Sequence, residues 1–309
     1  MGDVMLAQVR LLSQCPLCYG HRTKSIRAEK NSFPPNLHPE VMIFNSTWSH
    51  LIRCLDCSFA FVQEIPTSPT FFLNRYDNSW FNPEEEVKSF RKTSIFKEVF
   101  DILKKQGATA GKFLDVGSFA GKLLYCAREE GYEPEGIEIN PKLANFTREK
   151  LNFKVYCSEF QSAVLPENYY DVITIIDVLE HLTGPKEVLA NLLTSLKKGG
   201  ILYIKVPHYP MQILKQDIAR VLRISDAGVF SNFGHINHFN IKSMRKVLNE
   251  IGFSLVQVEI ARPEKWSKGR SLWRLRNLIR DVIWMTSSFL YRCTGTCAGL
   301  NLIFVAKKR

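Results

Sequence analysis

The sequence has no apolar stretch long enough to cross a bilayer, because no window approaches the roughly 18 unbroken apolar residues that a membrane-spanning helix needs. The first ten residues lack the charged and then apolar layout of a secretory signal. The chain also contains no internal repeat and no low-complexity tract. These absences favour a folded, cytoplasmic protein, and they leave peripheral contact with the inner membrane surface open as an alternative.

Most of the chain also lacks an excess of basic over acidic residues. The formal net charge is +11, but residues 241–309 hold 14 Lys or Arg against 4 Asp or Glu, whereas residues 1–240 hold 27 against 26. Residues 1–60 hold only 6 basic and 4 acidic side chains, which is a poor electrostatic surface for binding phosphates. This distribution disfavours nucleic acid as a partner.

Eight cysteines in a chain expected to be cytoplasmic favour thiols or metal ligands over a disulfide framework. Four of them form two CxxC pairs, Cys15 with Cys18 and Cys54 with Cys57, whose spacing suits a tetrahedral Zn²⁺ site. We expect a closed, structural zinc site, and unmetallated thiols are the alternative. The remaining cysteines are interpreted as buried or incidental thiols: Cys126, Cys157, Cys293 and Cys297.

The pattern of the chain changes near residue 65. Residues 1–65 contain both cysteine pairs and no sustained helical period, which suits a small zinc-ribbon-like module held by a metal. Residues 66–309 are predicted to form one catalytic domain. Within it, residues 207–240 are expected to be an irregular substrate loop and residues 268–292 a basic amphipathic helical insertion.

Short β-rich runs alternate with helical patterns after residue 112, which is typical of crossover units around a mostly parallel sheet. The predicted strands are 113–116, 136–139, 154–157, 172–176, 201–206, 254–260 and 300–306. Helices are expected at about 90–105, after the first and second strands, and at 185–198, 241–251 and 272–290. The predicted fold is a doubly wound α/β fold with a seven-stranded, Rossmann-like sheet whose last strand is antiparallel.

A glycine-containing loop follows the first of these strands. Gly117 and Gly121 would let the backbone approach a ligand closely or adopt positive φ. Glu138 ends the second strand, 23 positions after Asp115, where an acid can accept hydrogen bonds from ribose hydroxyls. A glycine loop of this kind is shared by many nucleotide-binding α/β proteins, so it does not by itself identify the ligand.

Further along, the sequence IIDVLEH ends the fourth strand and the turn KKGG precedes the fifth. Together with the pair His238 and Phe239, these motifs resemble the class I (Rossmann-like) methyltransferases over about residues 112–260, and they disfavour a dinucleotide enzyme. The loop departs from the family pattern at Phe119, where a third glycine is usual.

The resemblance implies S-adenosylmethionine as cofactor and assigns a role to each motif residue. Asp115 would orient the loop near the methionine amino group, and Gly117 and Gly121 would allow close backbone approach. Glu138 would hold the ribose, and Asp177 would close the pocket. After the third strand, Ser158 and Glu159 stand where an adenine contact is expected, although Glu159 could equally be a solvated loop acid.

Four histidines are candidate bases, because imidazole takes up protons near neutral pH. His238 is the first choice, since it occupies the His-Phe position of the resemblance, and His181 is the second. His208 and His235 are weaker candidates. His235 and His238 also have HxxH spacing, but the sequence suggests no third metal ligand.

The combination of a zinc module with this type of methyltransferase resembles sugar methyltransferases of surface-glycan or antibiotic-sugar pathways. We therefore expect a sugar or lipid-linked glycan acceptor, methylated on oxygen or carbon. The alternatives are an RNA methyltransferase and a cofactor-binding protein without turnover. Residues 270–290 combine Arg with Trp, Leu and Ile, which predicts either contact with an anionic membrane surface or a core-packed helix. The sequence makes no prediction of oligomeric state.

Overall fold

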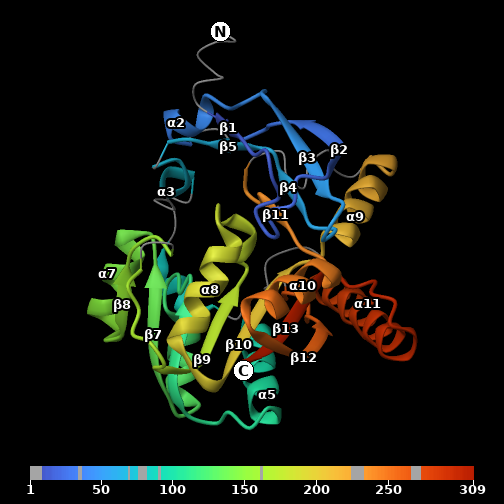
Figure 1. Cartoon of the computed structure of the whole chain (residues 1–309). Helices are drawn as coiled ribbons and strands as arrows, with labels where there is room; N and C mark the ends of the chain where they lie inside the picture. The colour runs from blue at the N-terminus through green and yellow to red at the C-terminus, as the bar shows by residue number, and fades with distance from the viewer. Residues whose placement is uncertain are drawn as a thin grey trace. The chain divides into compact units, whose positions relative to one another are not determined.

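The computed structural model describes residues 9–33, 37–68, 70–75, 82–89, 92–160, 163–223, 233–265 and 273–309 (Figure 1). The chain divides into two compact units that are interleaved along the sequence. The first unit comprises Met1–Ser79, Val178–Val188 and Pro207–Val247. The second comprises Trp80–Asp177, Leu189–Val206 and Leu248–Arg309. The predicted domain boundary between residues 65 and 66 divides the chain into two continuous segments, and it stays a prediction.

The second unit is built on a seven-stranded sheet in the order β12-β13-β10-β9-β6-β7-β8. Neighbouring strands from β10 to β8 are parallel, whereas β12 and β13 pair antiparallel. The strands are β6 (Gly111–Val116), β7 (Tyr132–Glu138), β8 (Lys154–Cys157), β9 (Tyr170–Ile176), β10 (Leu196–Pro207), β12 (Phe253–Ile260) and β13 (Asn301–Lys308). This arrangement confirms the predicted α/β fold class.

Helix α5 (Thr93–Lys105) covers part of this sheet because its apolar residues recur at helical spacing. Ile95, Val99 and Leu103 are buried in one core cluster with Phe113 of β6 and Tyr203 of β10. Burial of side chains of this size contributes about 1.5–3 kcal/mol each. Phe90, which belongs to the predicted helix, lies outside the described residues.

The connecting helices begin where the sequence predicts. Helix α6 (Lys122–Glu129) follows β6, and α7 (Pro141–Leu151) follows β7. The Asn140 side chain accepts hydrogen bonds from the first backbone N–H groups of α7, which fixes the start of that helix at the end of β7. Helices α8 (Pro185–Ser195) and α10 (Ile241–Ile251) each begin in the first unit and end in the second. The KKGG turn lies at the start of β10, where the register with β9 shifts.

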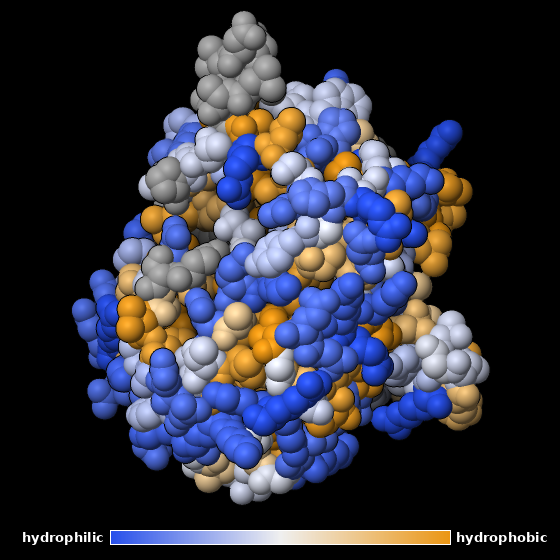
Figure 2. Space-filling view, in the orientation of Figure 1, coloured by the Kyte–Doolittle hydropathy of each residue, from blue (hydrophilic) through white to orange (hydrophobic). Residues whose placement is uncertain are grey.

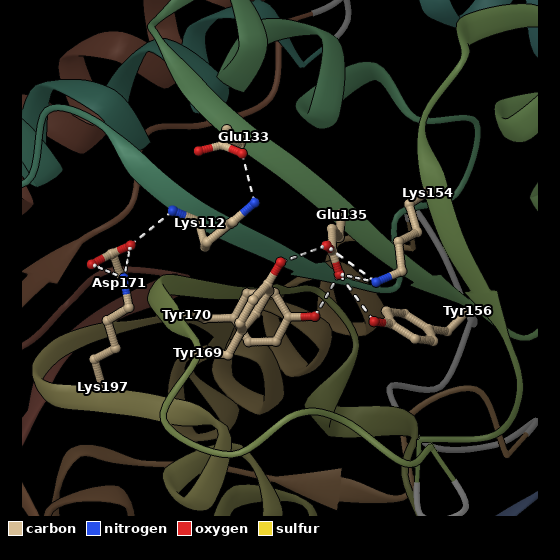
Figure 3. A network of polar contacts seen from close by, with 9 residues as sticks. All are labelled: Lys112, Glu133, Glu135, Lys154, Tyr156, Tyr169, Tyr170, Asp171 and Lys197. Atoms are coloured by element: carbon tan, nitrogen blue, oxygen red, sulfur yellow. Dashed lines mark hydrogen bonds and ion pairs between the residues drawn. The ribbon is translucent and has the colours of Figure 1, made fainter.

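A polar network lies where several strands of the sheet begin (Figure 3). Buried Glu135 accepts hydrogen bonds from the hydroxyls of Tyr170 and Tyr156, at 2.8 and 3.1 Å. Asp171 accepts hydrogen bonds from the amine of Lys197 at 2.8 and 2.9 Å. The network thus joins the middle of β7 and β8 to the first residues of β9 and β10, and it leaves the carboxyl ends of the strands for a ligand.

The first unit contains a four-stranded antiparallel sheet in the order β11-β4-β3-β2, and a separate β1-β5 pair. The strands are β1 (Val9–Leu11), β2 (Thr23–Lys30), β3 (Trp48–Cys54), β4 (Ala60–Val62), β5 (Glu64–Pro66) and β11 (Asn237–His238). Its core is rich in aromatic rings, including Phe44, Phe71 and Phe233. Short helices accompany it in the chain: α2 (Pro39–Met42), α3 (Phe71–Arg75) and, in the second unit, α4 (Pro83–Lys88).

The prediction of an irregular stretch over residues 207–240 was wrong in its first part. Helix α9 occupies Tyr209–Val221, with Pro210 in its first turn and apolar residues at helical spacing after it. Residues 224–232 of the expected loop lie outside the described residues. Near the end of the stretch, β11 pairs with β4, with His238 opposite Ala60.

Helix α11 (Trp273–Thr294) confirms a helix between the last two strands of the sheet. Arg270 and Leu272, at the start of the predicted helix, lie outside the described residues. Among the helices that the structure describes, none combines the length and the apolar character needed to cross a membrane.

Candidate functional site

Asp115 lies at the centre of the candidate cofactor site. It is the penultimate residue of β6, is 5% exposed, and accepts a hydrogen bond from the Thr174 hydroxyl of neighbouring β9 at 2.7 Å. Burial raises the pKa of Asp115 from 3.8 to about 7, and the Thr174 bond lowers it only in part. A cationic ligand group beside this carboxyl would favour its ionised form.

The loop after β6 takes the backbone conformation that glycine favours at three positions. Gly117, Phe119 and Gly121 have φ of 80°, 50° and 78°. At Gly121 a Cβ atom would come within 2.6 Å of the Thr147 side chain, so a larger residue does not fit. Phe119 therefore takes a conformation that glycine favours although it carries a side chain, at a cost of roughly 1–2 kcal/mol.

Glu138 is the last residue of β7 and is buried. Its Oε2 accepts a hydrogen bond from the backbone N–H of Phe119, and its Oε1 accepts one from the backbone N–H of Asn140, both at 2.8 Å. Burial raises the pKa of Glu138, and these backbone hydrogen bonds lower it. The carboxylate is thus held in one orientation at the edge of the sheet, next to the glycine loop.

The other predicted cofactor residues lie at the same edge of the sheet, at the ends of β8 and β9. Ser158, half-buried, and Glu159, exposed, directly follow β8, whose Cys157 pairs with Glu138. Asp177 follows β9 with φ of 56° and forms ion pairs with the buried Lys205 of β10 and, at 3.5 Å, with Lys92.

The described part of the second unit therefore brings all seven predicted cofactor residues to the carboxyl ends of β6, β7, β8 and β9. Two features fit S-adenosylmethionine: a fixed carboxylate suits ribose hydroxyls, and the buried Asp115 suits an ammonium group. The glycine loop between them has the positive φ values that close backbone approach requires. Where these residues would contact the cofactor stays a prediction.

The four cysteines of the two CxxC pairs form a second candidate site, in the first unit. Their sulfurs all lie within 4.8 Å of one another, with Cys15 Sγ 3.7 Å from Cys57 Sγ and Cys18 Sγ 3.6 Å from Cys54 Sγ. Four sulfurs at about 2.3 Å from a central Zn²⁺ would be about 3.8 Å apart in a tetrahedron. The distances between the sulfurs thus match those of a zinc site, and they are much longer than the S–S bond of a disulfide.

Both CxxC pairs form the same kind of turn. The N–H of Tyr19 donates to the carbonyl of Cys15, and the N–H of Ser58 donates to the carbonyl of Cys54; Tyr19 and Ser58 have φ of 59° and 67°. Burial and neighbouring thiols raise the pKa of Cys18 to about 12, so without a cation this thiol keeps its proton. Of the other four cysteines, Cys157 and Cys293 are exposed.

A third cluster, also in the first unit, contains Glu180, His181 and His235. One carboxylate or imidazole atom from each lies within 4.8 Å of the other two, and Glu180 is buried. His181 Nδ1 hydrogen-bonds to the carbonyl of Gly234, and the two imidazole rings are 4.9 Å apart. Such a set of side chains could hold a proton or a divalent cation.

His238, the first-choice base, has a different environment. It is 3% exposed, and burial together with the charge of His235 lowers its pKa to about 3. A neutral imidazole with so low a pKa is a weak proton acceptor at neutral pH. His208 is also buried, at the start of α9.

Several residues of these sites were not identified from the sequence. Thr174 and Asn140 bind the two buried carboxylates of the cofactor site, and Lys205 pairs with Asp177. Lys205 was detectable in principle, because it is the lone charge within the apolar run from Ile201 to Val206. Glu180 stands inside the DVLEH motif itself, and its nearness to His181 and His235, within 4.8 Å, indicates a role.

Comparison with known proteins gives the same picture. A family model described as a methyltransferase domain matches residues 87–258, which is more than half of the chain. Similar curated proteins include the ubiquinone biosynthesis O-methyltransferases of Coxiella burnetii, 24% identical over 130 residues, and Nitrosospira multiformis, 26% identical over 136. The matches cover 40% and 41% of this chain. The chain spans about half the length of these curated relatives, 55% and 56%.

Among solved structures, the chain is similar to phosphoethanolamine N-methyltransferase 2 of Haemonchus contortus in complex with S-adenosyl-L-methionine. The TM-score is 0.53 with 16% sequence identity, over 81% of this chain and 62% of that chain. At this identity the likeness concerns the fold. The family match shows that the chain belongs to the methyltransferase-domain family, and the similarity in fold agrees with it.

Proposed function

We propose that the protein transfers a methyl group from S-adenosylmethionine to a sugar or a lipid-linked glycan. The observation that carries the cofactor part is the buried Glu138 carboxylate, fixed by two backbone N–H groups beside the glycine loop. The acceptor part is supported by the resemblance to sugar methyltransferases that join a four-cysteine module to this type of domain.

Bound S-adenosylmethionine would supply an activated methyl group on a sulfonium centre. Glu138 would accept hydrogen bonds from the ribose hydroxyls, and Asp115 would pair with the methionine ammonium group. The backbone of the loop from Gly117 to Gly121 would lie against the methionine part. These contacts would hold the methyl group in line with an acceptor atom, which is the main requirement of the transfer.

We assign the role of base to His181 ahead of His238. The hydrogen bond from His181 Nδ1 to the Gly234 carbonyl places the proton on Nδ1 and the lone pair on Nε2, so the ring can accept a proton there. Glu180 and His235, within 4.8 Å, would stabilise the imidazolium or share the proton. A hydroxyl acceptor would give up its proton to this ring, and carbon methylation would use the same ring to form an enolate.

We also propose that Cys15, Cys18, Cys54 and Cys57 hold Zn²⁺. The sulfur separations and the two matching turns support this assignment. With four protein ligands and no position for water, the ion would be structural and would stabilise the small first unit.

A second candidate acceptor is a hydroxylated quinol or another phenol. It is favoured by the sequence similarity to the ubiquinone biosynthesis O-methyltransferases. A phenolic hydroxyl has a pKa near 10, well below that of a sugar hydroxyl, so it would depend less on the base.

The experiment is to incubate the protein with methyl-labelled S-adenosylmethionine and four separate acceptor pools: nucleotide sugars, lipid-linked glycans, prenylated hydroquinones and RNA. Label in either sugar pool supports the proposal. Label in the hydroquinone pool alone supports the second candidate and overturns the first, and label in RNA alone overturns both. If the cofactor binds but no pool takes up label, the protein binds S-adenosylmethionine without methylating these acceptors, and the proposed activity is wrong.

A further inference from the structure

Helix α11 has the reverse of the polarity that a helix docked on a protein core normally shows. Eight of its large apolar side chains are exposed, and the residues it buries are Asn277 and Ser287. Phe289 is 71% exposed and Met285 60% exposed. The exposed apolar residues of the helix are Leu275, Leu278, Ile279, Val282, Ile283, Met285, Phe289 and Leu290.

These eight side chains form one continuous face. At about 3.6 residues per turn they fall within about half of the helix circumference. Arg274 and Arg292 lie along one edge of this face, and Arg276 lies along the other. We call this surface, the eight apolar residues with the three arginines at its edges, the α11 face.

The opposite side of α11 fixes the helix to the second unit through specific contacts. Trp284 Nε1 donates a hydrogen bond to the carbonyl of Ile260 at 2.9 Å, and the Arg262 guanidinium lies over the Trp284 ring. Asp281 pairs with Lys265. These contacts set the orientation of the helix, so the α11 face points away from the unit that carries it. In Figure 1 α11 lies at the edge of its unit, and in Figure 2 hydrophobic and hydrophilic residues lie side by side there.

We propose that the α11 face docks on a membrane surface that contains anionic lipids. A helix that lies in a membrane interface needs an apolar face that enters the acyl boundary and basic residues that meet anionic headgroups at its edges. The α11 face has both. Asp281, the one acidic residue of the helix, lies outside the apolar part of the α11 face, beside its arginine edge, and pairs with Lys265.

A second copy of the chain is a poorer occupant of this face. Pairing two α11 faces would bring arginine-lined edges against each other, and the one acidic side chain of the helix, Asp281, is already paired with Lys265. Because α11 is not a spanning helix, contact would be peripheral, with the helix axis in the plane of the surface. This inference does not depend on which acceptor the enzyme methylates.

The test is flotation of the full chain with large unilamellar vesicles of phosphatidylcholine, with and without phosphatidylglycerol. We expect the chain to float with the anionic vesicles, and to be released by salt, because surface attraction is screened by ions. Val282→Glu with Phe289→Glu should lower the lipid partition coefficient at least about tenfold. Arg274→Gln with Arg276→Gln should lower it roughly tenfold or more, since each basic residue near an anionic surface contributes about fivefold.

The matched control is Lys104→Gln with Lys105→Gln on α5, which removes the same charge from two exposed positions outside the α11 face. It should leave partitioning within about twofold of the unchanged chain. The substituted side chains are exposed, and circular dichroism identifies any variant that fails to fold. If the glutamate variant does not fold, the variant with both arginines replaced is compared with the control instead. The proposal is overturned if the unchanged chain does not float, or if the α11 variants and the control bind equally. It is also overturned if the α11 face instead holds a dimer that these substitutions dissociate.

Discussion

The backbone N–H of Phe119 donates a 2.8 Å hydrogen bond to Oε2 of Glu138, and so joins the loop after β6 to the end of β7. The bond forms at the residue that replaces the usual glycine of the loop. It holds Phe119 at a φ of 50° and at the same time orients the carboxylate. The side chain at Phe119 therefore does not prevent the hydrogen bond between this loop and the end of β7.

Substitution at Phe119 should reveal the strain of this conformation. Phe119→Gly and Phe119→Ala remove the same aromatic ring, but only glycine adopts positive φ without a steric cost. We expect Phe119→Gly to be more stable than Phe119→Ala by about 1 kcal/mol in chemical denaturation. The control is the pair Lys105→Gly and Lys105→Ala in α5, where the alanine variant should be the more stable of the two by roughly 0.5–1 kcal/mol. Equal stability of the two Phe119 variants would contradict the strained geometry.

Replacing Asp115 should change stability in a pH-dependent way. With its pKa raised to about 7, the folded protein keeps a proton that the unfolded chain releases near the ordinary value of 3.8. The stabilisation by this group is complete below that value and is lost as the pH rises to about 7. The side chain introduced by Asp115→Asn cannot ionise, so this variant does not lose stability in the same way as the pH rises. Without cofactor, the Tm of Asp115→Asn minus the Tm of the unchanged chain should therefore be larger at about pH 8 than at about pH 5. A Tm difference independent of pH would contradict the raised pKa.

The same variant should bind S-adenosylmethionine less tightly, because the carboxylate that would pair with the ligand ammonium group is gone. We expect a loss of about tenfold or more, measured by calorimetry near pH 8. Unchanged affinity would show that Asp115 does not contact this part of the cofactor.

Removing one cysteine of the cluster should remove the metal. The unchanged chain, produced with zinc in the medium, should contain equimolar zinc by atomic emission, and Cys54→Ser should lose most of it and unfold at a lower temperature. Cys293→Ser is the control, because Cys293 is exposed and outside the cluster. Zinc-free protein with an unchanged Tm in the presence of a chelator would contradict the proposed site.

His181→Gln should lower kcat by about a hundredfold or more and abolish the acidic limb of the pH–rate profile, because the proton acceptor is lost. His238→Gln should keep that limb, since the low pKa of His238 leaves its ring neutral throughout the measured range. The reverse result would assign the base to His238. Thermal unfolding of both variants distinguishes a catalytic effect from a loss of stability.

The succession of strands and helices along the chain could be predicted because most strands contain a short apolar run. Strands β7 and β10 nevertheless begin four and five residues before their predicted starts, and residues 196–198 belong to β10 and not to the end of the preceding helix. Lys154–Cys157 and Ile241–Ile251 match their predictions to the residue. Helix α9 was missed although its apolar residues have helical spacing, because the surrounding histidines, glycines and asparagines resemble a loop.

Contacts between residues far apart in the sequence could not be predicted in the same way. The Phe119–Glu138 hydrogen bond and the placement of Glu180 within 4.8 Å of His235 depend on how loops fold against each other, and no local sequence pattern shows this. Burial is a similar case: His238 was chosen from its place in a motif, and its low pKa follows from its surroundings in the folded unit.

The most direct test of the central claim is the affinity of S-adenosylmethionine, measured by calorimetry, for Glu138→Gln and Glu135→Gln. Both residues are buried glutamates of β7, but Glu135 lies in the middle of the strand and accepts hydrogen bonds from Tyr170 and Tyr156, in a network separate from the glycine loop. We expect Glu138→Gln to weaken binding by about 10- to 100-fold, and Glu135→Gln to stay within about threefold of the unchanged chain. Equal affinities for the two variants, or no binding to the unchanged chain, would contradict the assigned cofactor site.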